Sequence, residues 1–325
     1  MKILGSGYYI PKRKVMSEEI DDLINVPNGT VLKKTKIRER YYADYNNTET
    51  ASKMGRAAAE TAIKNAGIKK EDIDLIIGAN ATKEILLPCS ASLVHRELGL
   101  ENMKTACFDV DSTCLSFFTA LEVADSLLKT KKYKNILVVS SEIASIGLNY
   151  DEIESAGIFG DGAAAFLLTS DEREIKSKFQ TFSKGLNYTE VCGGGTKYPI
   201  KNYNEKNKKD YLFHMDGEKS FKLIKQKIGN FFSEFLSENN ISLADVDKVV
   251  AHQASASGLR LIGKYLNINE NKIINIVSDY GNMVAASIPF SFAYGIEKNL
   301  IKKNDKILIV GTSAGISIGM MALEY

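Results

Sequence analysis

Residues 70–79 read KEDIDLIIGA, and residues 244–252 read ADVDKVVAH. Each is a short acidic turn followed by a run of apolar residues that is typical of a buried strand. These two segments match each other, and a second pair of segments also matches: residues 134–140 (KNILVVS) and residues 305–311 (DKILIVG). The first pair is offset by 173 positions and the second by 171. Two nearly equal offsets indicate an internal duplication, although βα units resemble one another in general.

An amphipathic helix precedes each acidic turn. One is predicted over residues 48–66 and the other over residues 221–237, where apolar side chains recur at helical spacing. Alternating strands and helices favour parallel-rich sheets covered on both faces. We therefore predict an α/β protein with an N-terminal half over residues 1–170 and a C-terminal half over residues 171–325. The Lys- and Asn-rich stretch 201–210 is predicted to be a solvated loop.

The composition is that of an ordinary globular protein, with 44% apolar residues, 25% charged residues and a net charge of +2. That charge implies neither a nucleic-acid partner nor a membrane surface. The apolar run 156–168 is too short to cross a bilayer. The four cysteines (Cys89, Cys107, Cys114 and Cys192) show no C-x-x-C spacing, which favours a reduced, cytoplasmic compartment. No spacing of His and Cys suggests a metal, and no cofactor is expected.

Cys114 lies in residues 108–121, FDVDSTCLSFFTAL, where a short strand gives way to an apolar helix. A thiol at a helix N-terminus meets unpaired N–H groups and the positive end of the helix dipole, so we expect its pKa to be lowered. A buried cysteine that only fills the core is the alternative.

His252 and Asn282 stand in comparable places. His252 follows a strand-like run and leads into a helix, while Asn282 follows a strand predicted over residues 273–277 and a turn at Gly281. Catalytic groups gather at the carboxyl ends of strands in α/β proteins. A Cys with distant His and Asn partners is typical of an activated thiol nucleophile, although each partner taken alone has a structural reading.

With these residues in view, the chain resembles the ketoacyl-ACP synthase III group of the thiolase-like superfamily, nearly from end to end. The matching motifs are residues 36–40 (KIRER), the Cys114 segment, 159–165 (FGDGAAA), 215–217 (MDG), 252–254 (HQA), 281–282 (GN) and 311–315 (GTSAG). The resemblance implies a five-layered αβαβα sandwich built from two duplicated halves, in a homodimer. The last motif lacks the second cysteine of thiolases, and Asn282 stands where elongating synthases have His.

The resemblance further implies a two-stage reaction. Cys114 takes an acyl group from acyl-CoA or acyl-ACP, and the enolate left when malonyl-ACP loses CO2 then attacks it. The backbone N–H groups of Cys114 and Ala314 would form the oxyanion hole, and His252 and Asn282 would hold the enolate. Leu87 matches a position that enters the partner's acyl pocket.

Three basic residues match positions where the family places cations that dock the acidic acyl carrier protein: Lys222, Arg260 and Lys264. Arg260 and Lys264 are four residues apart and so share a helix face. The alternative is that all three are ordinary solvated charges.

Three departures concern the acyl donor. Where the family commonly has a Trp and two Arg that contact coenzyme A, this chain has Thr30, Ile146 and Ser257. We therefore expect a specialised lipid or polyketide pathway with a different acyl donor, for which acyl-CoA and a carrier-bound acyl group are the two alternatives. Two alternatives stay open: an acyltransferase that passes the acyl group to an alcohol or amine, and a non-catalytic partner subunit of a condensing complex.

Overall fold

The computed structural model describes residues 1–325 and contains two five-stranded mixed sheets. The first has the order β1-β7-β6-β4-β5, and the second has the order β12-β11-β13-β14-β8. The strands of the first are β1 (Lys2–Tyr9), β4 (Leu75–Gly78), β5 (Ala106–Asp109), β6 (Asn135–Glu142) and β7 (Gly162–Thr169). Those of the second are β8 (Lys176–Thr181), β11 (Lys248–Ala251), β12 (Ile273–Ile274), β13 (Lys306–Ser313) and β14 (Ser317–Glu324).

The two sheets have the same topology. In the first sheet β4 is parallel to β5 and β6, and β7 pairs antiparallel with both β6 and β1. In the second sheet β11 is parallel to β12 and β13, and β14 pairs antiparallel with both β13 and β8. The two strand pairs recognised by their sequence offsets are β4 with β11 and β6 with β13, which occupy equivalent places. The predicted α/β class with duplicated strand patterns is confirmed.

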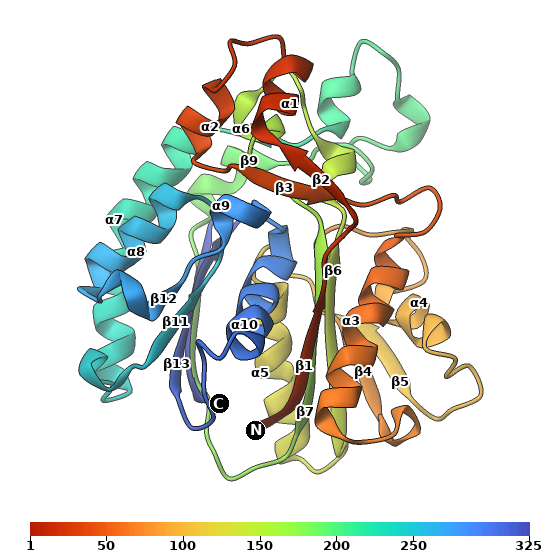
Figure 1. Ribbon diagram of the computed structural model, residues 1–325, viewed down its shortest axis with the longest axis vertical. Coiled ribbons are helices and arrows are strands. Elements are labelled where there is room, and N and C mark those ends of the chain that lie inside the picture. Colours follow the sequence, from red (N-terminus) through yellow and green to blue (C-terminus); the bar gives the residue numbers. More distant parts are fainter.

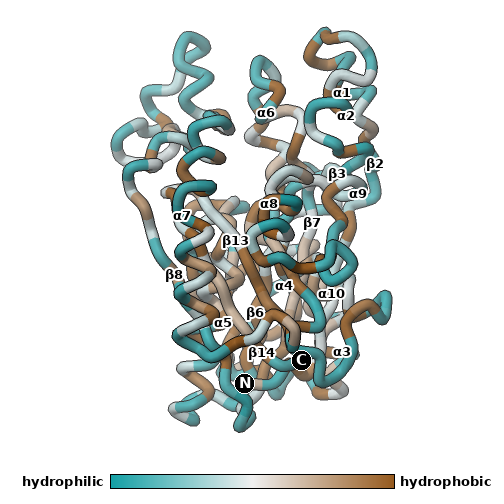
Figure 2. Tube along the Cα trace, turned by 90° about the vertical axis from the view of Figure 1, so that its left-hand side faces the viewer, coloured by the Kyte–Doolittle hydropathy of each residue, from teal (hydrophilic) through white to brown (hydrophobic).

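Helices complete the five layers (Figure 1). α5 (Ser116–Lys129) and α10 (Ser287–Glu297) lie between the sheets, α3 (Ala51–Ala66) and α4 (Ser90–Glu97) cover the outer face of the first, and α7 (Gly217–Glu238) and α8 (Ala256–Leu266) cover that of the second. Three buried apolar clusters fill the spaces between these layers. Figure 2 shows the result, with apolar segments inside and hydrophilic segments along the outer helices and loops.

Strand β13 shows how alternation in the sequence builds this sandwich. Ile307 and Ile309 pack into the central cluster, whereas Leu308 and Val310 pack into the cluster beneath α7 and α8. Successive strand residues point to opposite faces, so an uninterrupted apolar run is required where both faces are covered.

Smaller elements gather at one end of the sandwich (Figure 1). They are β2 (Arg13–Met16), α1 (Ser17–Leu23), α2 (Thr30–Thr35), β3 (Glu39–Tyr42), α6 (Ile153–Ala156), β9 (Thr189–Glu190), β10 (His214–Met215) and α9 (Val277–Tyr280). The predicted loop 201–210 is largely exposed, with short 3-10 turns at Ile200–Asn202 and Lys208–Tyr211. No helix has the length and apolar character needed to cross a membrane.

Helix and strand ends differ from the predictions where side chains bind the backbone. The first outer helix begins at Ala51 because the Thr50 side chain accepts the N–H of Lys53, and Asp216 caps α7 in the same way. The strand predicted over 273–277 is wrong beyond Ile274. There Gln253 donates to the carbonyl of Ile274 (3.0 Å) and accepts the N–H of Ile276 (3.0 Å), which replaces the pairing of a longer strand.

Candidate active site

Cys114 and His252 both lie beyond the carboxyl ends of strands. Cys114 follows β5 by a few residues, and His252 follows β11 directly. The backbone N–H of His252 is donated to the carbonyl of Val310 in the neighbouring β13 (2.8 Å). His252 is 5% exposed, and its Nδ1 has no hydrogen-bond partner in the protein. No carboxylate therefore orients this imidazole.

Gly311 brings the turn that carries Cys114 close to this histidine. A Cβ placed on Gly311 would lie 2.6 Å from Leu115 Cδ2 and 3.3 Å from His252 Cβ, so both neighbours pack against the bare backbone of β13. Just beyond the end of this strand, the backbone N–H of Ala314 interacts with the thiol of Cys114 and favours its charged form, as does the N–H of Cys114 itself. The sulfur thus faces the two N–H groups predicted to form the oxyanion hole.

Asn282 is held against the loop that precedes β7. Its backbone N–H is donated to the backbone carbonyl of Ile158 (2.8 Å), and its backbone carbonyl accepts the N–H of Gly160 (3.1 Å). In the side chain, Oδ1 accepts from Val284 N–H (2.9 Å) and Ser287 Oγ (3.3 Å). Both bonds use the oxygen, which leaves the Nδ2 group available as a donor.

Burial acts on the two titratable groups in opposite directions. It lowers the pKa of His252 to about 4, so the imidazole is neutral at pH 7. Burial, with the nearby carboxyl of Glu142, raises the pKa of Cys114 to about 12. The prediction of a lowered thiol pKa is therefore wrong. Cys114 precedes the first residue of α5, Ser116, by two positions, and the favourable backbone N–H groups do not offset desolvation.

Local hydrogen bonds shape the turn that presents the sulfur. Thr113 has φ 52°, a left-handed conformation that is costly for a β-branched residue. Its N–H is donated to Asp111 (2.9 Å), and its carbonyl accepts from Ser116 Oγ (2.7 Å). These bonds hold the backbone of the turn in place directly before Cys114.

Comparison with known proteins identifies the family of this chain. Residues 108–185 match the family model "3-Oxoacyl-[acyl-carrier-protein (ACP)] synthase III", and residues 236–325 match the model of its C-terminal part. The chain is 33% identical to a beta-ketoacyl-[acyl-carrier-protein] synthase III of Aliarcobacter butzleri over 98% of this chain and 96% of that protein. It is 32% identical to one from Clostridium perfringens, over 99% and 98%.

The chain belongs to the 3-oxoacyl-ACP synthase III family. The crystal structure of 3-oxoacyl-[acyl-carrier-protein] synthase III from Aquifex aeolicus superposes with a TM-score of 0.88 at 27% identity, covering 100% of this chain and 99% of that one. The thiolase-like fold is thereby confirmed, and the protein is a synthase III-type condensing enzyme.

Glu142 is a residue of this synthase that the sequence analysis missed. It ends β6 in full burial, and its carboxyl accepts from Ala81 N–H (2.6 Å), Thr82 N–H (2.8 Å) and the Thr82 hydroxyl. Burial raises its pKa to about 8, and it lies close enough to raise the pKa of Cys114. An acidic residue at the end of the apolar run 135–142 is the signal that could have revealed it.

Two other predicted sites of the synthase are at the surface. Leu87 is 86% exposed, so within one protomer it lines no pocket. Lys222 on α7 and Arg260 and Lys264 on α8 are exposed and form no ion pair, and the two helices pack side by side. The structure contains no group of three or more His, Cys, Asp or Glu that could hold a metal.

Proposed function

We propose that Cys114, His252 and Asn282 are the catalytic residues of this synthase. In the first stage, the sulfur of Cys114 bonds to the carbonyl carbon of an acyl thioester, and the bond from that carbon to the donor sulfur breaks. The thiol proton passes through His252 to the departing thiolate. The N–H groups of Cys114 and Ala314, which already favour negative charge at the sulfur, hold the transient oxyanion.

In the second stage, the bond between the malonyl carboxylate and the neighbouring carbon breaks, and CO2 leaves. The electron pair becomes an enolate, whose oxygen accepts from one N–H of neutral His252 and from Asn282 Nδ2. The enolate carbon then attacks the acyl carbonyl, the bond from that carbon to the Cys114 sulfur breaks, and the released thiolate takes up a proton from solvent. The observation that carries this proposal is the pair of uncharged donors: a neutral imidazole, and a carboxamide whose oxygen is already bonded.

The experiment separates the two stages. Intact-mass spectrometry measures the acyl adduct on Cys114, and release of labelled CO2 from malonyl-ACP measures decarboxylation. We expect Cys114→Ala to abolish the adduct and Asn282→Ala to keep it while CO2 release falls about 100-fold or more. His252→Ala should slow both adduct formation and CO2 release, because His252 takes part in both stages. An adduct without CO2 in the wild-type protein would instead support an acyltransferase. Absence of any adduct would support a non-catalytic subunit.

The substrates follow from the family, which uses an acyl thioester and a carrier-bound malonyl group. We propose a carrier-bound acyl donor, because Thr30, Ile146 and Ser257 stand where the family commonly has residues that contact coenzyme A. Of these, Ile146 is 53% exposed and offers no charge to a coenzyme. The unpaired cations Lys222, Arg260 and Lys264 are proposed to dock the acidic carrier.

The enzyme is further proposed to act as a homodimer in the cytoplasm, with halves 1–170 and 171–325. Ile85, Leu86 and Leu87 are 44%, 71% and 86% exposed in one protomer, and three consecutive exposed apolar side chains favour burial against a partner. Leu87 would then enter the partner's acyl pocket. All four cysteines are free, as a reducing compartment requires. Light scattering that gives the mass of a single chain would contradict the dimer.

A further inference from the structure

The segment Asn80–Pro88 connects β4 to α4 without any helix or strand of its own. At its far end it presents the exposed side chains Leu86 and Leu87. A connection of this kind is ordinarily mobile, since it lacks the repeated hydrogen bonds of a regular element. Here, two carboxylates bind its backbone and its neighbours.

The first carboxylate belongs to Glu142. It accepts the N–H groups of both Ala81 (2.6 Å) and Thr82 (2.8 Å), as well as the Thr82 hydroxyl. Two further bonds join the same strand end to the segment: Ile143 N–H to Thr82 Oγ1 (3.2 Å), and Ser141 N–H to Asn80 Oδ1 (2.8 Å). The beginning of the segment is thus tied to the end of β6.

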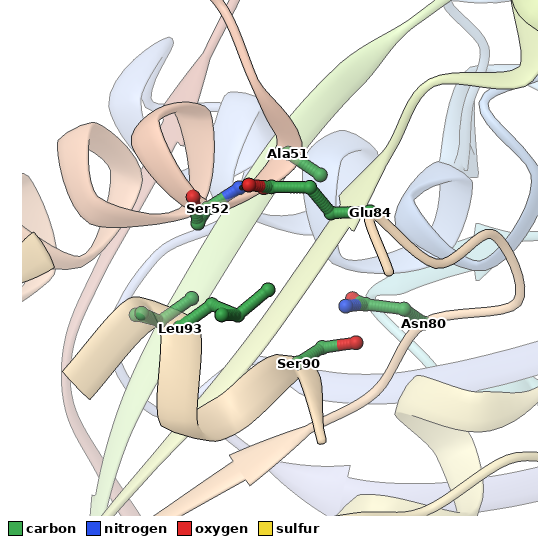
Figure 3. Close-up of a pocket in the computed structure, with 7 residues that line it drawn as sticks. Ala51, Ser52, Asn80, Glu84, Ser90 and Leu93 are labelled. Carbon is green, nitrogen blue, oxygen red and sulfur yellow. Dashed lines mark hydrogen bonds between the residues drawn. The ribbon is translucent and has the colours of Figure 1, made fainter. Parts of the chain in front are cut away.

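The second carboxylate belongs to Glu84. Its Oε2 accepts the N–H of Ser52 (2.7 Å) in the first turn of α3, a turn that contains no acidic residue. Figure 3 shows the Glu84 side chain extended from the segment to this helix end. The free N–H groups and the dipole of α3 favour a negative charge there, so this contact is stronger than a bond between neutral groups.

The space beneath the segment is nearly filled. The cavity between Glu84, Asn80, Ser90 and the two helices has a volume of only about 10 Å³ (Figure 3). A cavity of that size admits at most one water molecule. Little free space is therefore left between Glu84 and the two helices.

We propose that Glu84 and Glu142 are positioning residues that hold the segment Asn80–Pro88 in one shape and so set which acyl chains the enzyme accepts. The inference rests on the proposed function, in which Leu87 enters the partner's acyl pocket. One methylene of pocket space discriminates substrates by about 10- to 200-fold, so a small displacement of Leu87 is enough to change selectivity. Neither carboxylate needs to touch the acyl chain.

Glu84 gives the sharper test, because it is exposed and its carboxyl binds the first turn of α3. Glu142 lies near Cys114, so replacing it changes both the segment and the thiol. Thr82→Val offers a second variant: it removes the hydroxyl that donates to Glu142 and accepts the N–H of Ile143, and it keeps both backbone contacts of Glu142. Glu101→Ala is the matched control, since Glu101 is an exposed acidic residue elsewhere on the surface.

The assay is the rate of acyl transfer to Cys114 from acetyl and decanoyl thioesters of N-acetylcysteamine, followed by intact-mass spectrometry. These probes contain neither coenzyme A nor a carrier, so they report the acyl pocket alone. We expect the decanoyl-to-acetyl rate ratio to rise about tenfold in Leu87→Ala and in Glu84→Ala. Glu84→Gln should restore the wild-type ratio, because its Oε1 still accepts from Ser52, and Glu101→Ala should leave the ratio unchanged.

The double variant Glu84→Ala/Leu87→Ala should match Leu87→Ala alone, because both changes act through one side chain. If Leu87→Ala changes the ratio and both Glu84→Ala and Thr82→Val leave it unchanged, the positioning role is overturned while the proposed function stands. If Leu87→Ala itself has no effect, the acyl-pocket role of Leu87 falls and this inference falls with it. Equal slowing of both thioesters in Glu84→Ala, with a lowered melting temperature, would reduce Glu84 to a stability residue.

Discussion

Gly311→Ala is the substitution whose effect the structure defines most sharply. The added Cβ would lie 2.6 Å from Leu115 Cδ2, 3.2 Å from Ile288 Cδ1 and 3.3 Å from His252 Cβ. Leu115 and Ile288 are completely buried, so neither can turn into solvent. Carbon atoms pack best at about 3.5–4.0 Å, and Leu115 must therefore retreat by roughly 1 Å. Overpacking of this kind costs about 1–3 kcal/mol of unfolding free energy.

The retreat of Leu115 has a second consequence, because this residue adjoins Cys114 and directly precedes α5. A misplacement of about 1 Å at a reacting group costs roughly 100-fold in rate. We therefore expect Gly311→Ala to slow acyl transfer to Cys114 by about that factor, with kcat affected more than KM.

Urea unfolding and the rate of adduct formation measure the two effects. Gly195→Ala is the matched control, since a Cβ on Gly195 meets no atom within 4 Å. A Gly311→Ala protein with unfolding free energy within about 0.5 kcal/mol of the wild type, and with an unchanged acylation rate, would refute the packing of Leu115 and His252 against this glycine.

Three other predictions concern charge and substrate. Asn282→Asp places a carboxylate where the enolate charge develops, so CO2 release should fall by a factor equivalent to about 3–4 kcal/mol while the Cys114 adduct persists; unchanged CO2 release would contradict the role of Asn282. Burial raises the pKa of Glu142 from 4.5 to about 8. Between these pH values the folded protein keeps a proton that the unfolded chain releases, so the free energy of unfolding falls as pH rises from about 4.5 to about 8. In urea unfolding, Glu142→Gln should make the free energy of unfolding less dependent on pH in this range. An unaltered dependence would contradict the contribution of Glu142. Acyl-pantetheine and acyl-CoA donors should give similar kcat/KM, because the residues expected to contact the adenine of coenzyme A are replaced. A preference of about tenfold or more for acyl-CoA, which corresponds to about 1.4 kcal/mol, would show that the enzyme does contact the adenine.

Much of the fold could be predicted because its signals are local. The apolar runs in β6 and β13 require coverage on both faces, and their nearly equal spacing from β4 and β11 reveals the duplication. The short strand β12 could not be foreseen, because the Gln253 side chain replaces its pairing partner beyond Ile274. That side chain comes from a position more than 20 residues earlier, and periodicity carries no record of it.

The same limit applies to the site. Cys114, His252 and Asn282 could be singled out, because each is a polar residue that follows an apolar strand. The pKa of Cys114 could not be predicted, because it depends on burial and on Glu142, which ends a different strand. The contact of Glu84 with α3 is equally invisible in the sequence, since it joins residues that are 32 positions apart.

The pKa shifts of Cys114 and His252 share burial as their largest cause. Burial makes the thiolate of Cys114 and the imidazolium of His252 both unfavourable, so the resting pair is neutral. A neutral His252 cannot hold a thiolate by charge, but it keeps the N–H that an enolate oxygen requires. The resting site is therefore better matched to the decarboxylative stage than to a permanent thiolate, and the acylation stage must obtain its thiolate only as the thioester carbonyl is attacked.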